Sequence, residues 1–105
     1  MSIKQFSHII MYNNQMNIRQ KVTIHDRVFS QIIDDEMVLL DTQSEAYFGL
    51  DAIGCEMWKQ LEKNPSLEAL KTYMLSHYEV EASQLSQDMA HFIDHLVKNK
   101  LIEIG

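Results

Sequence analysis

The hydrophobic pattern of this chain changes once, near Asp51, and that change limits the folds open to it. Between residues 22 and 50 the apolar residues form short runs rich in valine, isoleucine and aromatic side chains, which favour β-strands. After Asp51 they recur every three or four residues, the period of an amphipathic helix. Strands followed by helices predict an α+β domain.

The strand-like part predicts an antiparallel meander. Its first section, residues 22–33, is followed by the turn signal Asp34-Asp35 and then by the short run Met37–Leu40. A polar turn leads to the third strand, Ala46–Leu50. Connections this short join antiparallel neighbours, so we expect a three-stranded antiparallel sheet.

The helical part predicts three α-helices, each with a start signal. Asp51, Ser66 and Ser83 are expected to act as N-caps, because their side-chain oxygens accept the free amide N–H groups of a first turn. Asn64-Pro65 separates the first two helices, and Asn99 is expected to end the third in a left-handed conformation. The fold class is therefore α+β and resembles a winged helix-turn-helix.

The length of 105 residues corresponds to one domain. Residues 1–20 lack a sustained period, and we interpret them as a flexible N-terminal arm before a folded domain of residues 21–105. Alternatively, residues 1–18 add a strand to a sheet edge. The single cysteine, Cys55, excludes an internal disulfide, and no signal-peptide pattern is present, so a cytoplasmic location is expected.

The charge distribution disfavours nucleic-acid binding. The net charge is −6, and residues 34–50 contain only acidic charges. Binding to a phosphate backbone depends on clustered lysine and arginine, which this part of the chain lacks.

The residues that could bind a metal or act in catalysis have simpler structural interpretations. His91 and His95 have a spacing that suits a metal, but we expect them on a solvated helix face opposite the apolar stripe. Cys55 fits a small, partly buried residue, and the acidic residues 34–36 fit a hairpin turn. No catalytic residues, metal site or cofactor are predicted, which favours a binding module.

Three segments of the chain resemble a known protein family. Residues 35–41, Ala46–Asp51 with its Tyr47-Phe48-Gly49-Leu50 core, and Ile53 to Trp58 resemble the PqqD-like family. The resemblance extends over about residues 22–104, including the later helices. It implies a non-catalytic protein that grips the leader of a ribosomally made precursor peptide and presents it to modifying enzymes. Such proteins serve pyrroloquinoline quinone, lasso-peptide and other pathways, where they act as peptide chaperones called recognition elements.

The resemblance also implies a location for the peptide. It would bind as an extra strand beside the third strand and against the third helix, a mode in which main-chain hydrogen bonds provide affinity. Ala46, Phe48 and Leu50 would point to one face and Tyr47 and Gly49 to the other, with either face possible for the groove. The predicted peptide-binding residues are Glu45, Ala46, Tyr47, Phe48, Gly49, Leu50, Met89, Ala90, Ile93 and Val97.

Several expectations follow from this hypothesis. Proline at Phe48 would remove an amide donor from the shared strand ladder. Expected partners are the precursor peptide and a leader protease, cyclase or radical enzyme, and a homodimer is also open. The sequence departs from the usual family pattern in two places: Ser44-Glu45-Ala46 lacks the glycine that many members have before the aromatic pair, and Lys100 stands where a glycine often precedes the final aliphatic pair.

The alternative function is a winged-helix DNA-binding transcriptional regulator. Its recognition helix would be residues 83–98, whose expected exposed side chains include the acids Asp88 and Asp94 and the single lysine Lys98. That charge balance fits a phosphate backbone poorly.

Overall fold

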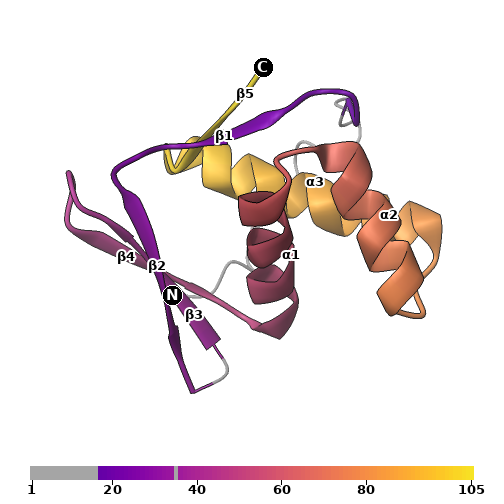
Figure 1. The fold of residues 1–105 in the computed structure, drawn as a ribbon, viewed down its shortest axis with the longest axis horizontal. Coiled ribbons are helices and arrows are strands. Elements are labelled where there is room, and N and C mark those ends of the chain that lie inside the picture. Colours follow the sequence, from indigo (N-terminus) through magenta and orange to yellow (C-terminus); the bar gives the residue numbers. More distant parts are fainter. Residues whose placement is uncertain (1–16, 35) are drawn as a thin grey trace.

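The computed structural model describes residues 17–34 and 36–105, and every structural statement below refers to them. Figure 1 shows the helices gathered on one side of a three-stranded sheet, with a smaller strand pair along the top. The strands are β1 (Val22–Ile24), β2 (Val28–Ile33), β3 (Glu36–Asp41), β4 (Ala46–Leu50) and β5 (Ile102–Ile104), and the helices are α1 (Ala52–Lys63), α2 (Leu67–His77) and α3 (Ala82–Lys98).

The predicted three-stranded antiparallel sheet is confirmed, with the order β2-β3-β4. Ile33 pairs with Glu36, so the first connection is two residues long. Asp34 has a φ of 52°, the positive value that two-residue hairpin turns require. Leu39 at the centre of β3 pairs with Phe48 of β4.

A second sheet was not anticipated. β1 and β5 form an antiparallel pair, with Val22 opposite Ile104. The pairing extends by one step, because Lys21 and Gly105 exchange backbone hydrogen bonds of 3.0 Å in both directions. Residues 22–24 therefore leave the meander and hold the end of the chain, whereas the sequence suggested only that residues 101 and 102 close the core.

Two of the three predicted helix starts are confirmed. Asp51 Oδ1 accepts the Gly54 amide at 2.9 Å, and Ser66 Oγ accepts the Ala69 amide at 3.1 Å. The prediction for the third helix was wrong, because α3 begins at Ala82 after Glu81, whose side chain makes no capping bond. Serine alone signals a cap poorly, since the backbone must also be extended at that residue.

The predicted left-handed end of α3 is displaced by one residue. Asn99 has a φ of −90°, whereas Lys100 takes the left-handed value of 60°. The Leu101 amide then donates to the Leu96 carbonyl at 2.9 Å, which satisfies one of the free carbonyls at the helix end. This turn sends the chain back into β5.

The core lies between the helices and one face of the larger sheet. Leu39 is fully buried there, and Trp58 of α1 is 1% exposed. On the opposite face Phe29 and Tyr47 are more than half exposed. The helices therefore cover one face of the sheet and leave the other open in the described part of the chain.

The predicted boundary between arm and domain is only partly visible. Residues 1–16, which hold most of the predicted arm, lie outside the described residues. Asn17 to Gln20 form a turn closed by a 3.0 Å bond from the Gln20 amide to the Asn17 carbonyl. Among the described helices, none has the length and apolar character needed to cross a membrane.

Candidate functional site

β4 is an edge strand in the described chain. β3 is bonded to β2 on one side and β4 on the other, and none of the described strands pairs with the outer side of β4. An edge strand presents unpaired N–H and C=O groups to which another strand can bond. The predicted location beside the third strand of the sheet is therefore geometrically open over the described residues.

The direction of the backbone groups can be followed along β3. Residues of a strand alternate in the neighbour to which their N–H and C=O point. The Thr42 amide donates to the carbonyl of Arg27, the residue just before β2, at 3.0 Å. Asp41 instead accepts the Glu45 amide, on the side of β4, at 2.7 Å. Odd-numbered residues of β3 therefore bond to β4.

This alternation assigns the free groups of β4. The partners of Asp41, Leu39 and Met37 are the even-numbered residues of β4, whose backbone groups are used within the sheet. Tyr47 and Gly49 lie between them, so their N–H and C=O groups point to the open edge. The prediction that proline at Phe48 would remove a donor shared with the peptide was wrong, because the Phe48 amide belongs to the β3–β4 ladder. Proline at Tyr47 or Gly49 would remove such a donor.

The side chains of β4 divide between the core and the open face. Phe48 and Leu50 are 7% and 2% exposed and join the core, with Ala46 packed against it. Tyr47 is 64% exposed. The question left open by the sequence is thus resolved: the Tyr47 side chain belongs to the uncovered face, and Gly49 takes the same position in the strand alternation.

α3 places its predicted site residues at different depths. Met89 is fully buried and Ile93 is 6% exposed, so both support the core. Ala90 is half-buried, whereas Val97 near the end of the helix is 38% exposed. Of these four residues, Ala90 and Val97 offer the most surface to a ligand.

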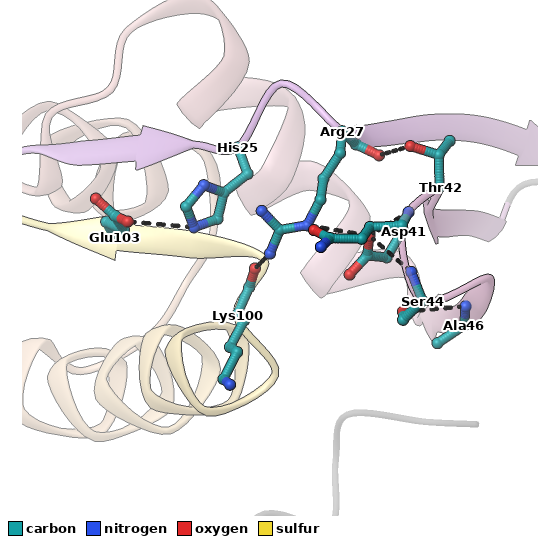
Figure 2. A network of polar contacts seen from close by, with 9 residues as sticks. His25, Arg27, Asp41, Thr42, Ser44, Ala46, Lys100 and Glu103 are labelled. Carbon is teal, nitrogen blue, oxygen red and sulfur yellow. Dashed lines mark hydrogen bonds and ion pairs between the residues drawn. The ribbon is translucent and has the colours of Figure 1, made fainter.

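A polar network fixes the Ala46 end of β4 relative to α3 (Figure 2). The Arg27 Nε donates to Asp41 Oδ1 at 3.1 Å, and its Nη2 donates to the Lys100 carbonyl at 2.6 Å. Asp41 in turn pairs with Ala46. Arg27 therefore ties the beginning of β4, through Asp41, to the turn that follows α3.

Asp41 is the one charged residue buried among those described. Burial alone would raise its pKa, but hydrogen bonds from the Gln43 and Ser44 backbone amides and the nearby Arg27 guanidinium together lower it. The carboxylate is therefore held in its charged form, and it organises the turn that leads into β4.

A cleft lies at the opposite end of β4, between α1 and α3. Its volume is about 300 Å³. The lining combines the start of α1 with the middle of α3 and consists of Asp51, Ile53, Gly54, Met57, Asp88, His91 and Phe92. His91 Nε2 is buried and has no hydrogen-bond partner within residues 17–34 and 36–105. The predicted site did not include this cleft, although Asp51 directly follows β4 in the sequence.

The histidines on α3 are less solvated than predicted. His91 and His95 are both half-buried, and burial lowers the pKa of His95 more than the nearby Asp94 carboxylate raises it. In the described residues, no group of three or more histidine, cysteine or acidic side chains is arranged to hold a metal ion. Cys55 is buried in the core.

Comparison with known proteins places the chain among proteins of one family. The family model of coenzyme PQQ synthesis protein D (PqqD) matches residues 36–102. No protein with a curated description matches the chain in sequence.

Two solved structures share the fold. The structure described as TbiB1 in complex with the TbiA(beta) leader peptide has a TM-score of 0.73 and 37% sequence identity, over 77% of this chain and 94% of that chain. A lasso peptide synthetase B1 complexed with the leader peptide has a TM-score of 0.72 and 24% identity, over 79% of this chain and 98% of that chain. The latter likeness concerns the fold alone.

Proposed function

This chain belongs to the PqqD family, and on that premise we propose that it captures the leader of a ribosomally synthesised precursor peptide and presents it to modifying enzymes. The leader would add as a fourth strand at the outer edge of β4. Residues 21–105 would form the recognition domain, with residues 1–20 as an arm.

The observation that carries this proposal is the open edge of β4. Tyr47 and Gly49 direct their backbone donors and acceptors away from β3, where a peptide strand can use them. At the Leu50 end of β4 lies the cleft that α3 lines together with Asp51 and α1, and at the Ala46 end the Arg27 network reaches the turn after α3. A strand added at this edge would therefore have α3 available as a wall.

The solved neighbours support the ligand class. TbiB1, at 37% identity over nearly its whole length, forms a complex with a leader peptide. The chain would act without catalysis, because strand addition supplies recognition through main-chain hydrogen bonds and the single cysteine, Cys55, is buried in the core. Its enzyme partner would be a leader protease, cyclase or radical enzyme, and pairing of two chains through their β4 edges would compete with the leader.

The test is equilibrium binding of the full chain to the synthetic leader encoded by the precursor reading frame beside its gene. Fluorescence anisotropy with the labelled leader should saturate with a low-micromolar or tighter Kd, and a scrambled leader should bind much more weakly. Equal binding of both peptides, or no binding by a folded protein, would overturn the proposal. Salt-dependent binding of duplex DNA in the same assay would favour a transcriptional regulator instead.

A further inference from the structure

The two ends of β4 differ in how their charges are compensated. At the Ala46 end, Arg27 forms an ion pair with the Asp41 carboxylate and donates to the Lys100 carbonyl. At the Leu50 end, the neighbouring cleft contains the carboxylates of Asp51 and Asp88. A peptide lying along the whole edge would thus meet an acidic cleft at the Leu50 end.

The cleft at the Leu50 end has the lining that a lysine or arginine side chain requires. Met57, Ile53 and Phe92 provide apolar contact for an aliphatic stem, and no lysine or arginine is among the lining residues. Asp88 accepts a hydrogen bond of 3.0 Å from the neutral amide of Gln84, which leaves its negative charge in place. A carboxylate on the incoming side chain would be repelled by the same group.

A second observation also points to a donor on the ligand. His91 lines the cleft, and its buried Nε2 has no hydrogen-bond partner among the described residues. Buried polar atoms are nearly always hydrogen-bonded, so this nitrogen lacks a partner that a bound group could supply. A guanidinium or ammonium carries several N–H donors, so it can bond to Asp88 and still offer donors to other polar groups of the cleft.

The direction of the peptide follows from the sheet. All strand pairs in the larger sheet are antiparallel, and antiparallel pairing is the more stable per residue. β4 runs from Ala46 to Leu50, so an antiparallel partner enters at Leu50 and leaves at Ala46. The residues before its paired stretch therefore lie beside Asp51 and the cleft.

We propose that the recognised peptide carries a lysine or arginine just N-terminal to its paired stretch, with the side chain seated in the cleft between α1 and α3. This inference rests on the proposed leader binding and adds the charge, position and direction of the ligand. It assigns Asp88 as the charged partner and His91 as a neighbouring polar group of the same cleft.

The test is a double-mutant cycle on the Kd of the same synthetic leader. Each lysine and arginine of the leader is replaced by methionine, which keeps an unbranched stem and removes the charge. The protein variant is Asp88→Asn, and the matched control is Glu68→Gln, which makes the same charge change at an exposed position of α2 outside the cleft. Asp51 is left unchanged because it caps α1.

One replacement on the N-terminal side of the paired stretch should weaken binding to the wild-type protein about fivefold, as for a partly exposed ion pair. The same replacement should have little effect on Asp88→Asn and its full effect on Glu68→Gln. A leader that binds tightly without a basic residue there, or with one that does not couple to Asp88, would overturn the inference and leave leader binding intact. Failure of the wild-type protein to bind any leader would overturn both.

Discussion

At the scale of single residues, three non-glycine positions in the described part of the chain have left-handed backbone. Asp34, Glu45 and Lys100 have φ values of 52°, 64° and 60°. Such values cost a residue with a Cβ atom about 1–2 kcal/mol, and glycine avoids this steric cost. Two of them, Glu45 and Lys100, lie in the turns where the family resemblance led us to expect glycine, and the left-handed backbone is adopted there by residues with a Cβ atom.

Glycine at either position should therefore stabilise the protein. We expect Glu45→Gly and Lys100→Gly each to raise the free energy of unfolding by about 0.5–1 kcal/mol, measured by urea denaturation, after the larger backbone entropy of glycine is subtracted. Gln87→Gly is the control, because Gln87 is exposed in the interior of α3 and should lose about 1 kcal/mol there. Loss of stability in both turn variants would show that side-chain contacts outweigh the backbone strain.

His95 gives the molecule a pH dependence with a defined sign. Burial lowers its pKa in the folded state, so the unfolded chain binds the proton more readily. Stability should then fall as the pH drops below about 6.5, the pKa of an unperturbed histidine. Between about pH 7.5 and pH 5, the free energy of unfolding should decrease more for the wild type than for His95→Gln. A greater decrease in the variant would contradict this assignment.

At the scale of elements, the helix starts separate real caps from apparent ones. Ser66 accepts the Ala69 amide, whereas Ser83 lies inside the first turn of α3. Ser66→Ala should lower the free energy of unfolding by about 1 kcal/mol, and Ser83→Ala should change it by less than about 0.5 kcal/mol. Thermal or urea unfolding of the two variants provides the comparison, and equal losses would place a cap at Ser83 after all.

The edge of β4 predicts a contrast between backbone and side-chain substitutions. Tyr47→Pro removes an outward N–H, and proline is tolerated on an edge strand, so leader affinity should fall about three- to tenfold while the fold persists. Tyr47→Ala keeps the N–H and isolates the contribution of the ring. Phe48→Pro should instead destabilise the sheet, because it breaks the β3–β4 ladder. Unchanged leader affinity of a folded Tyr47→Pro variant would rule out strand addition at this edge.

The elements show what a single sequence can and cannot predict. Hydrophobic period and capping residues were sufficient to place β3, β4, α1 and α2, because those signals are local. The pairing of Val22 with Ile104 was not predicted, since its partners are far apart in the chain and three-residue strands carry no measurable period. The outward direction of the Tyr47 and Gly49 backbone groups likewise depends on the pairing register of β3 and β4, which the sequence did not predict.

At the scale of the molecule, the site depends on contacts between distant segments. Arg27 connects Asp41 to Lys100 and so relates the larger sheet to the turn after α3. The cleft forms because Asp88, His91 and Phe92 of α3 come to the start of α1. The family resemblance predicted the two sides of the proposed binding region, whereas the cleft with its two carboxylates became evident only from the assembled fold.

The most direct test of leader capture at β4 is an amide-resolved NMR titration of the full chain with the synthetic leader. The account predicts that chemical-shift changes concentrate at Glu45–Leu50 and on α3 from Met89 to Val97, and that the Tyr47 and Gly49 amides become protected from hydrogen exchange. Saturating changes confined to β2 or α2, with the β4 amides unprotected, would contradict it.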